Sequence, residues 1–140
     1  MLNRAVFSSA SDHWSTPTHV YEALHEEFKF EYDPCPLMSS ESGLLKDWKG
    51  RVFCNPPYSA IDAFLRKGLG ELAEGNVTLL VYLIPSRTDT RWFHDYCIKA
   101  REIRFLRGRL RFGDAKNCAP FPSMLVIFDK WELPKMEIAA

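Results

Sequence analysis

The stretch Val77-Thr78-Leu79-Leu80-Val81-Tyr82-Leu83-Ile84 is apolar at every position except Thr78. A continuous apolar run of this length is typical of a strand that is buried on both faces of a sheet. A shorter run, Arg51-Val52-Phe53-Cys54, precedes it and stops at two prolines, which cannot continue a strand. Residues 61–72, between the two runs, carry apolar side chains at helical spacing. The order strand, helix, strand predicts an α/β protein.

The same periodicity predicts two more helices, over residues 20–28 and 92–100. Each of the three helices follows residue types that favour a helix N-terminus: Thr16-Pro17-Thr18 for the first, Ser59 with Asp62 for the second, and Thr88 or Asp89 for the third. Further strands are expected at residues 28–32, 102–112 and 123–128. The last two strands follow one another without a helical pattern between them, so we expect them to form an antiparallel hairpin.

The predicted architecture is an abbreviated Rossmann-like sheet, mostly parallel, with helices on both faces and a C-terminal antiparallel hairpin. The length of 140 residues fits a single domain, with a core over about residues 12–130 and loosely packed ends. In open sheets of this kind, ligands bind beyond the carboxyl ends of the strands. Three polar, proline-containing corners fall at such ends: Asp33-Pro34, Asn55-Pro56-Pro57-Tyr58 and Pro85-Ser86-Arg87.

The corner Asn55-Pro56-Pro57-Tyr58 has the chemistry needed to methylate an aromatic amine. The lone pair of such an amine is delocalised into its ring, so the amine must be held by hydrogen-bond acceptors that favour its nucleophilic form. The Asn55 side-chain oxygen and the Pro56 carbonyl can both accept from the amine, on a backbone that the prolines make rigid. Tyr58 offers an aromatic face on which a flipped base can stack. A plain strand-ending turn is the alternative interpretation of the two prolines.

Asn-Pro-Pro-Tyr resembles the catalytic motif of methyltransferases that act on adenine N6 or on a glutamine side chain. Other segments narrow the choice, because together they resemble the bacteriophage-type DNA N-6-adenine-methyltransferase family over about residues 12–130. These segments are Trp14–Pro17, Phe30–Cys35, Gly43–Trp48, Leu83–Thr90 with Trp92-Phe93, Gly108–Phe112 and Ala119–Ser123. The resemblance implies transfer of a methyl group from S-adenosylmethionine directly to the exocyclic amine of adenine in DNA.

The resemblance also implies roles for individual residues. Asn55, Pro56, Pro57 and Tyr58 would hold the target base. The cofactor would meet Trp14, Thr16, Pro17, Asp33, Pro34, Cys35, Asp47 and Asn55. Within that set, the Asp33 carboxylate would contact the methionine ammonium group, a charge-assisted interaction.

Two departures from larger enzymes of this class keep other functions open. No glycine-rich loop follows Asp33, where only Gly43 stands further along the chain, and no acidic residue is a clear anchor for the cofactor ribose. The spacing from Asp33 to Asn55 is too short for two strand–helix units, so one side of the sheet is expected to be abbreviated. The alternatives are methylation of cytosine N4 or protein glutamine, and a non-catalytic protein that binds the cofactor or DNA.

The formal net charge is +0, but the charge is unevenly distributed. Residues 22–50 are acidic on balance and residues 87–111 are basic, which can place a basic face on a neutral protein. The expected DNA contacts are Arg87, Thr88, Arg109 and Arg111, of which Arg109 and Arg111 would share one face of a strand. The solvated face of an amphipathic hairpin explains Arg109 and Arg111 equally well. For Arg87, a phosphate contact is favoured over a solvated arginine that opens a helix.

The remaining features set expectations for metals, partners and location. Cys35, Cys54, Cys97 and Cys118 are widely spaced, so no metal site is expected and the thiols should be free in a reducing, cytoplasmic compartment. The sequence has neither a signal-peptide pattern nor an apolar run of membrane-spanning length. DNA is the expected partner, and nothing indicates an obligatory protein partner or a membrane.

Overall fold

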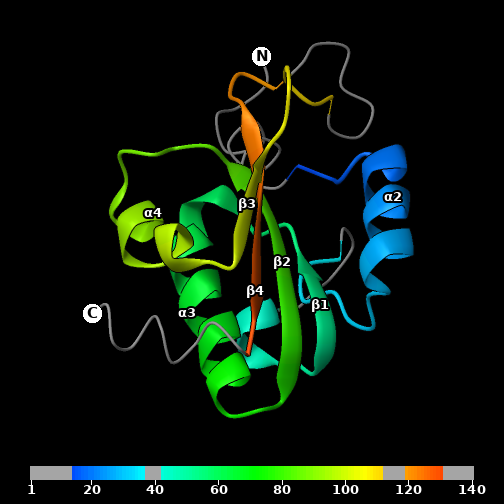
Figure 1. The fold of residues 1–140 in the computed structure, drawn as a ribbon, viewed down its shortest axis with the longest axis vertical. Helices are drawn as coiled ribbons and strands as arrows, with labels where there is room; N and C mark the ends of the chain where they lie inside the picture. The colour runs from blue at the N-terminus through cyan, green and yellow to red at the C-terminus, as the bar shows by residue number, and fades with distance from the viewer. Residues whose placement is uncertain (1–13, 37–41, 112–118, 131–140) are drawn as a thin grey trace, which may run out of the picture.

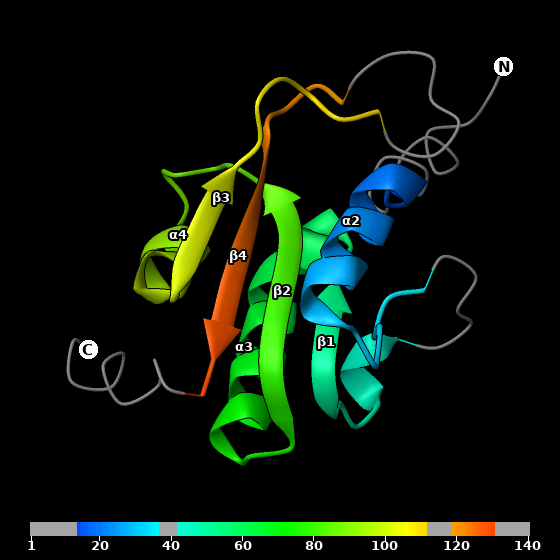
Figure 2. The same ribbon diagram turned by 45° about the vertical axis from the view of Figure 1, so that its right-hand side comes forward.

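A four-stranded mixed sheet forms the centre of the protein in a computed structural model, which describes residues 14–36, 42–111 and 119–130. The strands are β1 (Gly50–Cys54), β2 (Val77–Pro85), β3 (Glu102–Phe105) and β4 (Ser123–Asp129), in the spatial order β1-β2-β4-β3 (Figures 1 and 2). β1 pairs with β2 in parallel, whereas β4 runs antiparallel to both of its neighbours. Only one of these pairings is parallel, so the expectation of a mostly parallel sheet is corrected to a mixed one.

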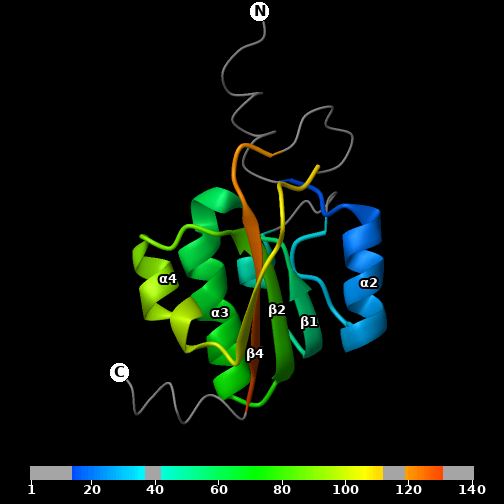
Figure 3. The same cartoon turned by 45° about the horizontal axis from the view of Figure 1, so that its top comes forward.

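Helices cover both faces of this sheet, as Figure 3 shows. One face carries α2 (Thr18–Phe28), and the other carries α3 (Ile61–Ala73) and α4 (Arg91–Asp95). The short 3-10 helices η1 (Gly43–Leu45), η2 (Tyr58–Ala60) and η3 (Cys97–Lys99) lie in the connections. The α/β class predicted from the order of apolar runs is therefore confirmed.

The apolar run at residues 77–84 forms β2, and its side chains divide between two cores. Leu79, Val81 and Leu83 pack on the α2 side, together with Phe53 of β1. Alternate residues, such as Leu80 and Tyr82, pack on the side of α3. From Leu79 onward the strand is apolar and buried on both faces, whereas Thr78 is exposed.

The strand predicted at residues 28–32 is wrong. Helix α2 continues to Phe28 and ends at Lys29 in the left-handed conformation, with φ 56°. Only an isolated parallel bridge between Tyr32 and Val52 follows, supported by a hydrogen bond from the Tyr32 backbone N–H to the Arg51 carbonyl. The chain thus runs beside β1 just long enough to place Asp33 at the carboxyl edge of the sheet.

Local details at the ends of the elements also differ from expectation. The N-cap residues are Pro17 and Ala60, neither with a side-chain cap hydrogen bond, and Thr90, whose hydroxyl accepts from the Phe93 N–H. The caps predicted at Ser59 with Asp62 and at Thr88 or Asp89 are therefore wrong. Strand β3 ends at Phe105 instead of reaching residue 112, which is itself outside the described residues.

In the part of the chain that the structure describes, no helix has both the length and the apolar character needed to cross a bilayer. Residues 1–13, 37–41, 112–118 and 131–140, including Cys118 and the predicted loose C-terminal end, lie outside the described residues.

Candidate active site

The carboxyl end of β1 brings the Asn-Pro-Pro-Tyr corner beside two other parts of the chain. Asn55 follows β1 directly, and the chain before α2 crosses to it (Figure 1). At the end of the neighbouring strand, Pro85 pairs with Ser123, the first residue of β4. The Ser86 N–H also donates to the Pro122 carbonyl at 2.9 Å. The described chain therefore converges on one edge of the sheet, where ligands bind in folds of this class.

Asn55 is buried, with 3% of its surface exposed, and its amide orientation is fixed by the segment before α2. The Nδ2 group donates to the Trp14 carbonyl and, at 3.0 Å, to the Thr16 hydroxyl. Both partners are acceptors, so the nitrogen must face them and the oxygen must face away. That oxygen, Oδ1, is buried without a hydrogen-bond partner in the described structure. A buried carbonyl oxygen without a hydrogen bond lowers the stability of the fold. We therefore infer that Oδ1 accepts a hydrogen bond from a ligand.

Aromatic rings surround the corner. The Tyr58 ring meets Phe121 edge-on at 5.0 Å between centroids, and Phe121 meets Trp14 in the same way at 6.1 Å. Burial raises the pKa of the Tyr58 phenol, and the positive charge of Arg87 opposes part of that shift. Tyr58 is therefore a neutral aromatic side chain at physiological pH, as a stacking residue should be.

The Asp33-Pro34-Cys35 corner holds a carboxylate at the same edge. The Cys35 N–H donates to Asp33 Oδ1 at 2.8 Å, so the side chain stabilises its own turn. Asp33 is half-buried at the end of the segment that bridges to β1. Its charge adds to the raised pKa of the Tyr32 phenol, which is caused first by burial, and Asp47 contributes to the same shift. The negative charges of Asp33 and Asp47 thus both act on the Tyr32 phenol.

Gly43 takes part in this corner through its backbone. A Cβ atom added there would lie 2.2 Å from the Pro34 carbonyl oxygen, so only glycine allows this close approach. The Gly43 carbonyl in turn accepts from the indole N–H of the buried Trp48 at 2.9 Å. Gly43 therefore packs the loop against the Asp33 turn, although the chain lacks a glycine-rich loop after Asp33.

Arg87 and Thr88 lie just beyond the end of β2, and both are exposed. The loop is held by its backbone, because the Arg87 carbonyl accepts from the Thr90 hydroxyl at 2.8 Å and the Thr88 carbonyl contacts His94 Nε2 at 2.7 Å. The positive charge of Arg87 opposes part of the rise in the pKa of Tyr58, so this charge acts on the Asn-Pro-Pro-Tyr corner.

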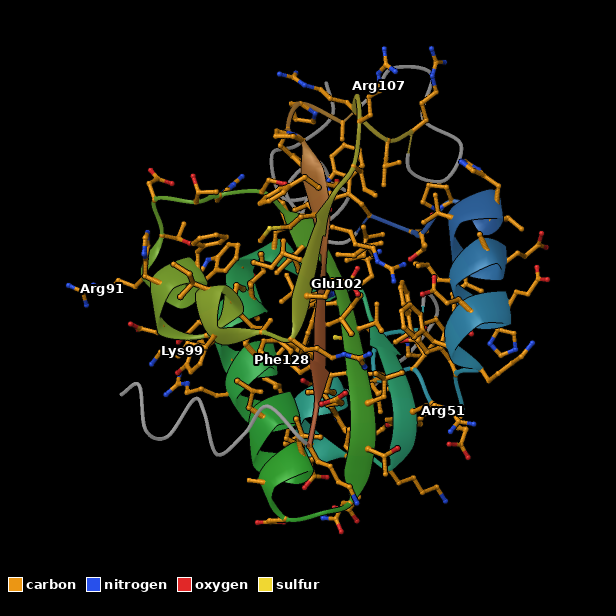
Figure 4. All side chains as sticks on the ribbon, viewed as in Figure 1. Arg51, Arg91, Lys99, Glu102, Arg107 and Phe128 are labelled. Atoms are coloured by element: carbon orange, nitrogen blue, oxygen red, sulfur yellow. The ribbon has the colours of Figure 1, made fainter. Side chains whose placement is uncertain are left out.

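Arg109 and Arg111 are exposed but do not form the strand ladder that the sequence predicted, because β3 ends before them. They follow Arg107, which Figure 4 shows at the end of the molecule toward which β3 runs. The Ala119 N–H donates to the Leu110 carbonyl at 2.8 Å, which joins this segment to the chain entering β4. The arginines therefore lie on a connection at the carboxyl edge of the sheet.

Sequence reasoning missed two residues of this site, Phe121 and Ser123. Phe121 contacts both Tyr58 and Trp14, and the buried Ser123 hydroxyl has no hydrogen-bond partner among the described residues. The segment Ala119–Ser123 was part of the family resemblance, and that was the available signal. Its side chains could not be placed at the catalytic corner without the pairing of β4 with β2.

A separate cleft of about 600 Å³ lies at the opposite end of the sheet, where β1 and β2 begin. Arg51, Arg101 and Asp129 are among its lining residues. Arg101 pairs with Asp129 at 2.8 Å, so these opposite charges neutralise each other. Among the described residues, no three His, Cys, Asp or Glu side chains come together as a metal site would require.

An α/β sheet with an Asn-Pro-Pro-Tyr corner and an acidic corner at one edge is the arrangement expected of an amino-methyltransferase. The sequence comparison defines the class further: residues 4–140 match the family described as DNA N-6-adenine-methyltransferase (Dam), and the chain belongs to that family. A protein of Escherichia phage T1 described as a DNA N-6-adenine-methyltransferase is 30% identical over 112 residues, which cover 71% of this chain. The matched region spans 46% of that relative's length. No solved structure matches the chain.

Proposed function

We propose that the protein is a DNA adenine N6-methyltransferase that uses S-adenosylmethionine, and that residues 1–140 act as one methyltransferase domain. The observation that carries the proposal is the Asn55 side-chain oxygen, buried and without a partner beside an aromatic cluster. Membership of the adenine methyltransferase family and the likeness to the phage T1 protein support the same activity.

Asn55 acts by accepting a hydrogen bond from the adenine amino group. Its orientation is set in advance by Trp14 and Thr16, so no reorganisation is needed when the base arrives. The Pro56 carbonyl is the proposed second acceptor, and the Tyr58 ring stacks on the base. Holding both amine hydrogens draws the nitrogen lone pair out of the ring plane, toward the methyl donor. The nitrogen gains the methyl group and releases one proton to solvent.

The cofactor fits the residues that border this corner. S-adenosylmethionine, when bound, supplies a methyl group activated by its sulfonium charge. The Asp33 carboxylate offers the negative charge that a methionine ammonium requires. Trp14 and Thr16 contact Asn55 directly, and Pro17 follows them in the chain. Pro34, Cys35 and Asp47 are the remaining proposed cofactor contacts. We assign the fold to an abbreviated Rossmann-like type, because three strands share one direction and the proposed ligand site is at their carboxyl ends.

DNA is the proposed substrate, held by phosphate contacts from Arg87, Thr88, Arg109 and Arg111. Their exposure and their place at the catalytic edge support this assignment. The base must leave the DNA stack to reach the buried Asn55 oxygen, as in other enzymes that modify bases. DNA as substrate makes the cytoplasm the proposed location.

The variant Asn55→Ala tests the catalytic corner. We expect methyl transfer to fall by about a hundredfold or more, because a preorganised transition-state contact is lost, while cofactor binding remains. Tyr58→Ala should also lose turnover, through loss of stacking. Mass spectrometry of nucleosides from DNA incubated with labelled cofactor measures transfer, and calorimetry measures cofactor binding.

The matched control is Asn76→Ala, because Asn76 is an exposed asparagine beyond the opposite end of α3, where it bonds to Glu71 and Glu74. It should keep wild-type transfer. Wild-type turnover by both Asn55→Ala and Tyr58→Ala would refute the catalytic corner. Label on cytosine N4 or on protein, instead of adenine N6, would refute the substrate. Failure of folded wild-type protein to bind the cofactor would point to a non-catalytic module.

A further inference from the structure

Five side-chain oxygens are buried without hydrogen-bond partners in the described structure: Tyr32 Oη, Asn55 Oδ1, Tyr58 Oη, Ser86 Oγ and Ser123 Oγ. The proposed function explains the Asn55 oxygen by a bond from the target amine. It does not explain Ser123, which is only 2% exposed and begins a strand that is apolar from Met124 to Phe128. A buried hydroxyl without a partner lowers stability, so its presence calls for a reason.

The strand register places Ser123 on the same face of the sheet as Asn55. Ser123 lies between Phe121 and Leu125 in the alternation of β4, and both of these residues pack in the core on the α2 side. Asn55 follows Phe53 by two residues, and Phe53 packs in that same core. The strands β1 and β4 flank β2 (Figure 2). By the alternation of side chains, Ser123 of β4 and Asn55, which follows β1, are therefore directed to the same side of the sheet.

An aromatic contact links the two segments that carry Asn55 and Ser123. Phe121, two residues before Ser123, contacts Tyr58, three residues after Asn55, at 5.0 Å between ring centroids. A flat ligand stacked on Tyr58 would have the Asn55 amide at one part of its rim and the β4 strand at another. Such a ligand needs polar groups on its edge and apolar faces, as a nucleobase has.

The side chains of Asn55 and Ser123 also differ in the hydrogen bonds that they can form with a ligand. Both Asn55 amide hydrogens are directed at Trp14 and Thr16, so Asn55 presents only an acceptor. A serine hydroxyl can donate. Adenine has the complementary pattern, with an amino donor and ring-nitrogen acceptors around one planar system.

We propose that Ser123 is a specificity-determining residue whose hydroxyl donates a hydrogen bond to a ring nitrogen of the target adenine, while Asn55 accepts from its amino group. This inference rests on the proposed function, and it assigns a second contact to the same base. Guanine carries a carbonyl where adenine carries the amine, so it would face the Asn55 oxygen with an acceptor and be rejected.

Ser123→Ala tests the inference on DNA that contains either adenine or an analogue in which one ring nitrogen is replaced by C–H: 1-deaza-, 3-deaza- or 7-deazaadenine. With adenine, we expect kcat/KM for methyl transfer to fall by about tenfold, the effect of one hydrogen bond left unmade. With one of the three analogues, wild type and Ser123→Ala should have equal kcat/KM, because that analogue lacks the ring nitrogen to which Ser123 would donate. A loss that is the same on all four bases, or no loss at all, would overturn the inference.

Ser86→Ala is the matched control, since Ser86 carries another buried and unpartnered hydroxyl near this edge. We expect it to show no analogue-dependent loss, and a loss equal to that of Ser123→Ala would contradict the assignment. Ser123→Ala should also unfold at the same temperature as wild type or above it, because an uncompensated hydroxyl has been removed. A lower unfolding temperature with uniform loss would indicate a structural role and overturn the inference. Wild-type protein that never methylates adenine would instead refute the proposed function.

Discussion

At the scale of single residues, the Asn55 amide shows how a short motif depends on a distant segment. Its nitrogen is held by Trp14 and Thr16, which are about forty positions earlier in the chain. An amide can rotate about its side-chain bonds, and a rotated amide would offer a donor to the amine instead of an acceptor. Trp14 and Thr16 therefore decide that the Asn55 side chain offers its oxygen and not its nitrogen, although the resemblance assigned these two residues to the cofactor.

Thr16→Val tests this positioning role, since valine has nearly the shape of threonine but no hydroxyl. We expect the methyl-transfer rate at saturating cofactor and DNA to fall by about tenfold, because Asn55 loses one of its two constraints. Thr16→Ser should restore the rate. Single-turnover kinetics measure the rate, and calorimetry measures cofactor affinity. A variant that binds the cofactor weakly but reacts at the wild-type rate would place Thr16 in the cofactor pocket instead.

At the scale of elements, Arg104 connects the edge strand β3 to the end of α2. Its guanidinium donates two hydrogen bonds to Glu27, at 2.7 and 2.6 Å, and two to Glu102, at 2.7 and 3.3 Å. It also lies 5.3 Å from the centre of the Phe28 ring. The hydrogen bonds lower the pKa of both carboxyl groups and raise that of Arg104. Glu27 and Glu102 therefore neutralise one of the basic side chains that lie between residues 87 and 111.

Arg104→Met should lower the free energy of unfolding at pH 7 by about 1 kcal/mol, since the cluster is partly exposed but bidentate. The folded-state pKa of Glu27 and Glu102 lies below the ordinary value of 4.5, so their contribution is present above that pH. It is lost as the pH falls through the lowered values. Urea unfolding of wild type and Arg104→Met at pH 7, 4 and 3 measures the difference in their free energies of unfolding. This difference should become smaller at low pH and approach the small contribution of the contact between Arg104 and the Phe28 ring.

Arg66→Met is the control, because Arg66 pairs with Asp62 along one exposed helix face at 3.0 Å. Its effect at pH 7 should be smaller, about 0.3–0.5 kcal/mol. A difference between Arg104→Met and wild type that stays constant from pH 7 to pH 3 would contradict the assigned ion cluster.

Most helices and strands followed from the pattern of apolar residues, whereas their ends did not. α2, α3, β1, β2 and β4 appear close to where periodicity predicted them, because each buries an apolar face. The N-caps predicted for α3 and α4 were wrong, since a suitable residue type does not show where the backbone turns. Residues 30–32 lie beside β1 without forming a strand, because α2 continues to Phe28 and leaves too little chain before Asp33.

At the scale of the whole molecule, charge is distributed by position in the fold. Arg101, at the start of β3, is neutralised by Asp129 where β4 ends. Arg87 and Arg109, in contrast, are exposed on connections at the carboxyl edge. A neutral protein can therefore present positive charge to DNA at the edge where the proposed chemistry takes place.

The salt dependence of DNA binding tests this arrangement. Each phosphate contact contributes about −0.9 to the slope of log K against log salt concentration. The double variant Arg87→Gln/Arg109→Gln should reduce the magnitude of that slope by about 2 and weaken binding to all DNA sequences. Fluorescence anisotropy with a labelled duplex, at several salt concentrations, measures it.

Arg101→Gln is the matched control, because it removes a cation from the opposite end of the sheet. Its slope should equal that of wild type. Equal slopes for all three proteins would show that Arg87 and Arg109 do not contact phosphate, and a reduced slope for Arg101→Gln would place the DNA elsewhere.

The sequence by itself determined the α/β class and the end of a strand at Asn55-Pro56-Pro57-Tyr58, because buried strands must be apolar and a diproline must end one. It also determined which family the chain resembles. Tertiary structure decided what surrounds the corner: the orientation of the Asn55 amide, the contact of Phe121 with Tyr58, and the position of Ser123. These depend on contacts between segments far apart in the chain, and on a reversed strand inserted between β2 and β3. Periodicity reports which face of an element is buried, but it does not report which element lies against that face.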